Sequence, residues 1–122
     1  IFAGFNAKPN KVISAFDVII APSNREPFGR TLVEAMIQFT PVLAARGGGH
    51  SEIINDGITG RLYSHNNIGN FMSQLDKYMN SRSAHKITNK ANTIASLKYS
   101  SQQHFENIVQ IYKQLVCSHS QK

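Results

Sequence analysis

Tryptophan is absent from this sequence of 122 residues, and cysteine and acidic side chains are scarce. Cys117 is the only cysteine, which excludes an intrachain disulfide and a zinc site built from several cysteines. The sequence has seven acidic residues and 13 lysines and arginines, so the formal net charge is +6. The excess of positive charge favours acidic partners such as phosphates or anionic lipid headgroups. The length suits a single domain, over residues 1–122, that can bury its own core.

Long apolar runs and dense basic clusters are also lacking. No stretch approaches the ~20 apolar residues that cross a bilayer, and no signal peptide is evident at the start. The sequence therefore predicts a cytoplasmic protein, with peripheral attachment to the cytoplasmic membrane as the alternative. Because the lysines and arginines are spread along the chain without interleaved aromatics, no nucleic-acid binding is expected.

The five histidines lack the spacing of metal ligands, so no metal site is expected. His50 lies beside a run of three glycines, where it could touch a substrate. The other four stand in polar surroundings and are interpreted as surface residues: His65, His85, His104 and His119.

Apolar spacing alternates between strand and helix over about the first 63 residues. The pattern predicts strands at about 1–5, 17–21, 41–45 and 60–63, helices at about 9–16, 29–39 and 50–56, and three further helices at about 67–80, 83–97 and 101–116. The expected fold class is α/β, a partial Rossmann-like parallel sheet of about four strands flanked by helices. A helical C-terminal extension covers 64–122.

The last expected helix has its own start signal and a continuous apolar face. Ser100 is followed three residues later by Gln103, the arrangement of a capping box. Its apolar face predicts a packing helix and consists of Phe105, Ile108, Val109, Ile111, Tyr112 and Leu115.

Residues 25–36 join a loop rich in proline and glycine to the start of a helix. Helical spacing puts Leu32, Val33, Ala35, Met36 and Phe39 on the core face, and Arg30, Glu34 and Gln38 on the opposite face. The first turn, near Gly29 to Leu32, offers unpaired backbone N–H groups to a phosphate oxygen.

Two carboxylates flank that first turn. Glu26 in the loop can accept hydrogen bonds from sugar hydroxyls, and Glu34 can reach the hydroxyl pair of a ribose. The alternative for Glu34 is a surface ion pair with Arg30 four residues earlier, and the alternative for Glu26 is a solvated loop acid.

The glycine run at 47–49 follows an expected strand, and it has two interpretations. It is either a flexible turn or a place where the backbone approaches a ligand closely, at the carboxyl edge of the sheet. Glu52 is expected to be a first-turn helix acid with a structural role. Gly57 and Gly60 are expected to be turn residues.

The segment Glu26-Pro-Phe-Gly followed by Glu34-Ala-Met resembles the E-x7-E signature of retaining glycosyltransferases of family 4 (glycosyl transferases group 1), which have a two-domain GT-B fold. The surrounding sequence agrees in order over about the first 63 residues. The matching segments are Phe2–Phe5, Ala15–Asp17, Pro41–Ala45, Gly47–Gly49, Glu52–Ile54 and Asp56–Gly60.

The resemblance implies a donor-binding domain whose substrate is a nucleoside diphosphate sugar, with no cofactor. Glu26 is then the catalytic candidate and also holds the donor sugar. The implied donor-binding residues are Glu26, Phe28, Gly29, Arg30, Thr31, Leu32, Glu34, Gly48 and Gly49. Full-length protein is expected to be a hexosyltransferase that acts on a carbohydrate or lipid-linked acceptor, and this chain alone is expected to be inactive.

The resemblance also implies that two strands, their helices and the N-terminal acceptor domain are missing, together with a basic pair that neutralises the diphosphate. Arg25, Arg30 or Arg46 could replace that pair. The missing strands would leave an exposed sheet edge open to self-association. Two other functions stay open: a non-catalytic module that binds nucleotide or self-associates, and a sugar-nucleotide epimerase.

Overall fold

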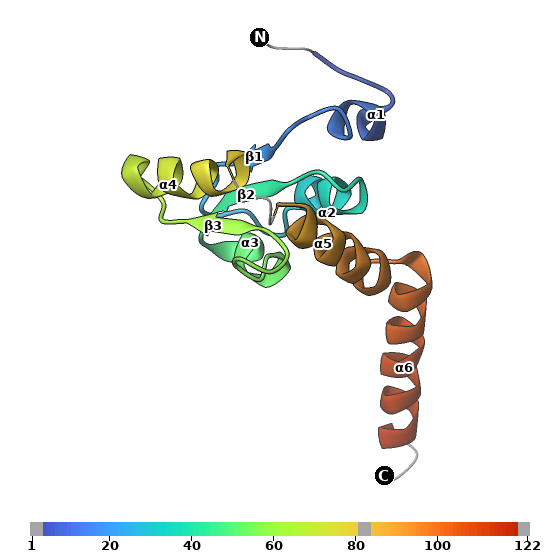
Figure 1. Ribbon diagram of the computed structural model, residues 1–122. Helices are drawn as coiled ribbons and strands as arrows, with labels where there is room; N and C mark the ends of the chain where they lie inside the picture. The colour runs from blue at the N-terminus through green and yellow to red at the C-terminus, as the bar shows by residue number, and fades with distance from the viewer. Residues whose placement is uncertain (1–3, 81–83, 120–122) are drawn as a thin grey trace.

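A three-stranded parallel sheet forms the centre of the computed structural model, which describes residues 4–80 and 84–119 (Figure 1). The strands are β1 (Ile19–Ala21), β2 (Val42–Ala45) and β3 (Arg61–Tyr63), in the spatial order β1-β2-β3. Ile20 is in register with Leu43, and Ala44 with Leu62. The expected α/β class with a parallel sheet is confirmed.

The described part of the chain has six helices: α1 (Pro9–Ile13), α2 (Arg30–Ile37), α3 (Gly48–Ile53), α4 (Ile68–Met79), α5 (Ala84–Lys98) and α6 (Ser101–His119). All four residues of β2 are buried, because helices cover the sheet on both faces (Figure 1). This position explains the uninterrupted apolar run in the sequence.

The alternation of side chains along β2 divides the core into two clusters. Val42 and Ala44 pack with Leu62 and with residues of α2, α3 and α5. Leu43 and Ala45 point to the other face, where they pack with Tyr63, with α4 and with the start of α5. The long helix α5 therefore contributes to both clusters.

The strand expected at 1–5 is not found where the structure can test it. Residues 1–3 lie outside the described residues, and Gly4 and Phe5 belong to no strand. Gly4 has a φ of 71°, and Phe5 is 96% exposed. The sheet of the described chain thus has three strands where about four were expected. β1 pairs with β2 alone, so its outer edge is open within this part of the chain.

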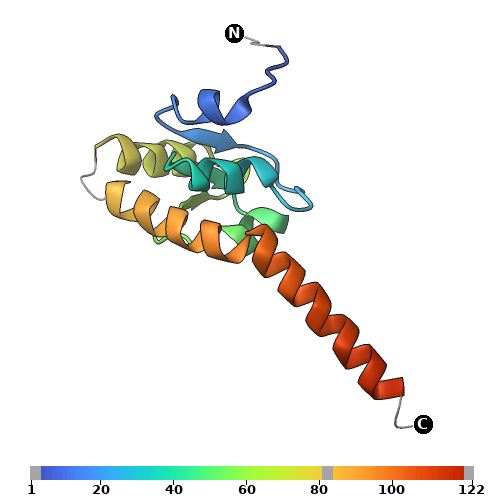
Figure 2. The ribbon, with the colours of Figure 1, turned by 90° about the vertical axis from the view of Figure 1, so that its right-hand side faces the viewer.

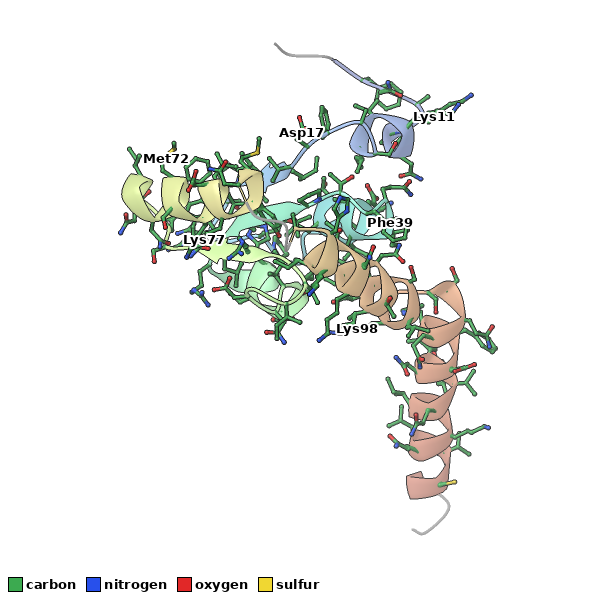
Figure 3. All side chains as sticks on the ribbon, viewed as in Figure 1. Lys11, Asp17, Phe39, Met72, Lys77 and Lys98 are labelled. Carbon is green, nitrogen blue, oxygen red and sulfur yellow. The ribbon has the colours of Figure 1, made fainter. Side chains whose placement is uncertain are left out.

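Helix α2 ends before Phe39, which was wrongly expected on its core face. Phe39 has a φ of 57° and is 56% exposed at the end of α2 (Figure 3). The Thr40 N–H donates to the Ala35 carbonyl at 2.9 Å, and the Phe39 N–H donates to the Met36 carbonyl at 3.2 Å. These two bonds form a Schellman motif, a helix ending that needs one left-handed residue. The chain direction reverses there, so Phe39 leaves the helical face.

Helix α6 leaves the body of the domain at the end of α5 and extends away from the sheet (Figure 2). The side chains expected to pack are largely exposed, including Phe105 at 62% and Tyr112 at 66%. The expectation of a packing helix is therefore wrong within the described chain, because no other described element lies along this face (Figures 1 and 2).

The start of α6 agrees with half of the expected capping box. The Gln103 N–H donates to Ser100 Oγ at 3.1 Å, as an N-cap serine requires. The Gln103 side-chain amide donates to Asn107 Oδ1 at 3.1 Å, and the reciprocal bond, from the Ser100 N–H to Gln103 Oε1, is not found among the described residues. Among the helices in the described ranges, none combines the length and apolar character needed to cross a bilayer.

Candidate functional site

Three loops meet where the strands end. They are residues 22–29 after β1, called here the Glu26 loop, the glycines after β2, and residues 64–67 after β3. The Asn24 side-chain amide lies 3.4 Å from His65 Nδ1, which joins the first loop to the third. The carboxyl ends of parallel strands lie at one edge of a sheet, where α/β folds bind ligands. This edge is therefore the candidate site.

The glycine run allows the Glu26 loop to lie directly against the start of α3. A Cβ atom at Gly47 would stand 2.6 Å from the Asn24 carbonyl oxygen, and one at Gly48 would stand 2.6 Å from that of Glu26. A Cβ at Gly49 would stand 2.5 Å from the Phe28 oxygen. The Gly49 N–H donates to the Glu26 carbonyl at 2.8 Å. The run was expected to be a flexible turn or a place of close approach to a ligand, and the close approach that the structure shows is to the Glu26 loop of the same chain.

Helix α2 starts without a side-chain cap. Its N-cap residue Gly29 has a left-handed φ of 92°, and no acidic residue lies in the first turn. Leu32 N–H donates to the Gly29 carbonyl at 3.0 Å, whereas the amides of Arg30 and Thr31 have no partner among the described residues. Unpaired amides at the positive end of a helix dipole bind anions. The arrangement can therefore hold a phosphate oxygen.

His50 was expected to be able to touch a substrate, and the structure places it in the core instead. It is 2% exposed, and its Nδ1 lies 3.0 Å from the Ala45 carbonyl oxygen. Because a carbonyl only accepts, the His50 Nδ1 carries the proton. Its Cδ2 atom lies 3.2 Å from the place where a Cβ of Gly29 would stand. His50 therefore ties the end of β2 to the start of α2.

The two candidate carboxylates have different surroundings. Glu26 is half-buried, and no donor among the described residues reaches its carboxylate. Glu34 Oε1 accepts from Arg30 Nε at 3.3 Å, with the Arg30 side chain 86% exposed and that of Glu34 31% exposed. The ion pair weighed for Glu34 thus exists, but an exposed i,i+4 pair contributes only about 0.3–0.5 kcal/mol. Either carboxylate can turn to a ligand at little cost.

Glu52 does not occupy the first turn of its helix, because α3 begins at Gly48 and not at residue 50. It is exposed on the last turn. Asp56 organises the following turn: its Oδ1 accepts the Leu62 N–H at 3.0 Å, and its Oδ2 is paired with Arg46. Gly57 has a φ of 76°, so its expected role in a turn is confirmed.

The sequence did not single out two contacts that shape this edge. One is the Asn24 bond to His65, and the other is an edge-to-face contact between the rings of Phe28 and Tyr99, whose centroids are 5.7 Å apart at 80°. Both join residues far apart in the chain, so no local spacing could reveal them. The second contact brings the end of α5 to the Glu26 loop.

A largely apolar cavity of about 460 Å³ adjoins the site. Its lining includes Ile20 and Pro22 from the end of β1, Tyr63 and His65 from the end of β3, and Phe71 from α4. Nowhere in the described chain do three histidine, cysteine, aspartate or glutamate side chains gather as a metal ion would require.

Solved structures and curated proteins resemble this chain. HepE of Anabaena, solved in complex with UDP-glucose, is 28% identical with a TM-score of 0.75, and the match covers 97% of this chain and 31% of HepE. A glycosyltransferase of Rickettsia africae is 27% identical with a TM-score of 0.82, covering 91% of this chain and 30% of that one.

A D-inositol 3-phosphate glycosyltransferase of Mycobacterium leprae is 38% identical over 68 residues, which are 56% of this chain and 16% of that protein. The chain therefore spans under a third of the length of these relatives. The family model described as glycosyl transferases group 1 matches residues 1–94. With the parallel α/β fold and the Glu26 loop in place, the chain belongs to the glycosyl transferases group 1 family.

Proposed function

We propose that this chain is the nucleotide-sugar-binding domain of a retaining glycosyltransferase of family 4, with residues 64–122 as its helical extension. In the full-length protein it takes part in the transfer of a hexose from a nucleoside diphosphate sugar to a carbohydrate or lipid-linked acceptor. An acceptor domain completes the enzyme, and the chain alone is inactive. We place the protein in the cytoplasm or at the cytoplasmic membrane surface.

The uncapped start of α2 carries the proposal. Its free amides at Arg30 and Thr31 follow directly on the Glu26 loop, whose backbone is held against α3 by the Gly49 amide. An anion there is stabilised by N–H groups that need no reorganisation, the property that assists a leaving group as charge develops. The relative HepE binds UDP-glucose and UDP, which supports a diphosphate as that anion.

The side chains around this anion site take the other parts of the donor. Glu26, without a donor of its own in the described chain, accepts hydrogen bonds from the sugar hydroxyls and acts at the reacting centre. Glu34 exchanges its weak pairing with Arg30 for the ribose hydroxyls. Arg30, once released, adds positive charge beside the diphosphate, and Arg25 is an exposed second candidate.

Calorimetry of the full chain with uridine, guanosine and adenosine diphosphates tests the binding step. Glu34→Ala should weaken binding of the preferred nucleotide by about tenfold to a hundredfold, because hydrogen bonds to a charged group contribute about 1.5–3 kcal/mol. Glu52→Ala, which removes an exposed acid on α3, is the matched control and should bind as the parent does. Equal affinities of all three chains would refute the role of Glu34.

The catalytic role of Glu26 needs the full-length enzyme. Glu26→Ala there should abolish sugar transfer while the unfolding transition stays in place, because the half-buried Glu26 carboxylate has no hydrogen-bond donor among the described residues. Unchanged transfer rates would contradict the catalytic role of Glu26. A free epimerised sugar nucleotide, formed without any acceptor, would instead identify the protein as an epimerase.

The open edge of β1 favours a second candidate, a self-associating module without catalytic activity. β1 pairs only with β2 in the described chain, and Ile20 on it is 41% exposed. Unpaired strand edges promote association. No nucleotide binding at millimolar ligand, together with a sedimentation mass that rises with concentration and falls in Ile20→Lys, would establish this candidate in place of the transferase.

A further inference from the structure

Phe28, in the middle of the Glu26 loop, is held from two sides. Its backbone lies against α3, where Gly49 leaves no room for a Cβ atom: the nearest Phe28 atoms would be 2.5–2.7 Å away. Its ring meets the ring of Tyr99 edge to face, with 5.7 Å between centroids. A loop residue fixed at both backbone and side chain has few alternative conformations.

Tyr99 is itself fixed by the end of α5. Its N–H donates to the Ala95 carbonyl at 3.0 Å, and its half-buried ring packs against the core cluster of α2, α3 and α5. Lys98 Nζ lies 5.2 Å from the centroid of the Tyr99 ring, at the end of α5 (Figure 3). The ring therefore presents a rigid surface to Phe28.

We infer that Tyr99 is a positioning residue: through Phe28 it fixes the Glu26 loop and, one residue later, the left-handed Gly29 that starts α2. The positions of the Glu26 carboxylate and of the first amides of α2 both depend on the backbone conformation of this loop. Loss of the Tyr99 ring allows Phe28 to turn away from α5, and the loop then samples paths in which those amides no longer converge. The effect on ligand binding rests on the proposed function, whereas the effect on the loop does not.

The test compares Tyr99→Leu with Tyr99→Phe in the full chain. Affinity for the nucleoside diphosphates is measured by calorimetry, and the amide signals of Gly29 and Arg30 are followed by NMR without ligand. Aromatic pairs contribute about 0.5–1.5 kcal/mol, so Tyr99→Leu should weaken binding by about threefold to tenfold. It should also move both amide signals. Tyr99→Phe keeps the ring and should leave affinity and signals as in the parent.

Ile87→Val is the control for a general loss of stability. Ile87 is buried on the opposite face of the sheet, with Leu43 and Tyr78. Truncation of a buried isoleucine to valine lowers the free energy of unfolding by about as much as the loss of an aromatic pair. It should leave nucleotide affinity unchanged. The inference is overturned if Tyr99→Leu leaves the two amide signals in place, or if Tyr99→Phe disturbs them as strongly. If the parent binds none of the nucleotides, the proposed function fails, and the amide signals still decide the role of Tyr99.

Discussion

At the scale of single residues, the candidate site depends on three glycines, which have no side chain. Gly47, Gly48 and Gly49 allow two backbone segments to touch, because a Cβ atom at any of them would lie within 2.6 Å of a carbonyl oxygen of the Glu26 loop. Gly47 and Gly48 also have positive φ angles, whereas Gly49 is excluded from substitution by the contact alone. The geometry of the loop therefore follows from the glycines of the neighbouring helix.

Gly49→Ala should separate the loop from α3. We expect it to lower the free energy of unfolding by about 1–3 kcal/mol, the usual range for overpacking, and to weaken nucleoside diphosphate binding, because Phe28 and the Gly49 amide must shift. Urea unfolding and calorimetry measure the two effects.

Gly69→Ala supplies the comparison for this substitution. In α4 a Cβ at position 69 would lie 3.6 Å from Asn67 Oδ1, an ordinary contact, and alanine favours a helix over glycine by about 0.5–1 kcal/mol. This variant should be as stable as the parent or more so. If Gly49→Ala had the same stability and nucleotide affinity as Gly69→Ala, the close approach of the Glu26 loop to α3 would be shown to contribute to neither property.

The sequence left two interpretations of these glycines, a flexible turn or a close approach to a ligand, and neither included their contact with the Glu26 loop. A glycine run shows that something comes near the backbone, and the Glu26 loop reaches that place only after the sheet has formed. His50 failed as a substrate contact for a related reason. It follows the glycine run in the sequence, yet as part of α3 its ring is buried against the end of β2, with Nδ1 3.0 Å from the Ala45 carbonyl oxygen. That contact is set by tertiary packing.

At the scale of elements, α2 ends with an unusual residue in its turn. A Schellman motif places a left-handed residue after the helix, most often glycine, and here Phe39 takes that position with a φ of 57°. A left-handed conformation costs an L-residue with a Cβ atom about 1–2 kcal/mol. The end of α2 is therefore a site of backbone strain beside an exposed ring.

Phe39→Gly should relieve this strain and raise the free energy of unfolding by about 1 kcal/mol, as measured by urea unfolding. Phe39→Ala removes the same ring but keeps a Cβ atom at the left-handed position, so it should bring no such gain. Equal stabilities of the two variants would show that the ring, and not the backbone, determines the effect.

Helix and strand positions near the site were largely predictable, because period and apolar runs are local signals. β2 and α2 begin within one residue of their expected starts. The exposed face of α6 was not predictable, since periodicity identifies an apolar face without identifying what covers it. Phe39 was misassigned because the same spacing continues past the point where the turn ends the helix.

At the scale of the whole molecule, Tyr78 links the sheet to α4. Its hydroxyl donates to the Val42 carbonyl at 2.9 Å, and the Arg61 guanidinium carbon lies 5.3 Å from its ring centroid. Burial raises the pKa of the Tyr78 hydroxyl above its ordinary value, although the positive charge of Arg61 acts in the opposite direction. The folded chain thus favours the protonated phenol.

This shift predicts a loss of global stability at alkaline pH. The contribution of Tyr78 is fully present below the unfolded pKa of about 10 and declines as the pH rises above it, because only the unfolded state then releases the proton. Urea unfolding of the parent and of Tyr78→Phe, followed from pH 8 upward, measures it.

Near neutral pH, Tyr78→Phe should be less stable than the parent by about 1–2 kcal/mol, since Val42 loses its donor. The difference in free energy of unfolding between the two chains should shrink above about pH 10. Because both chains have the same lysines, the effect of lysine titration cancels in this difference. A difference independent of pH would contradict the role given to the buried phenol.

The projecting α6 also has a practical consequence. The sole cysteine of the chain, Cys117, is exposed near the outer end of this helix, and α6 leads away from the Glu26 loop (Figure 2). A maleimide-linked fluorophore or spin label would attach at that single thiol without engineering and without entering the candidate site. The orientation of α6 can therefore be followed by spectroscopy while the candidate site remains unmodified.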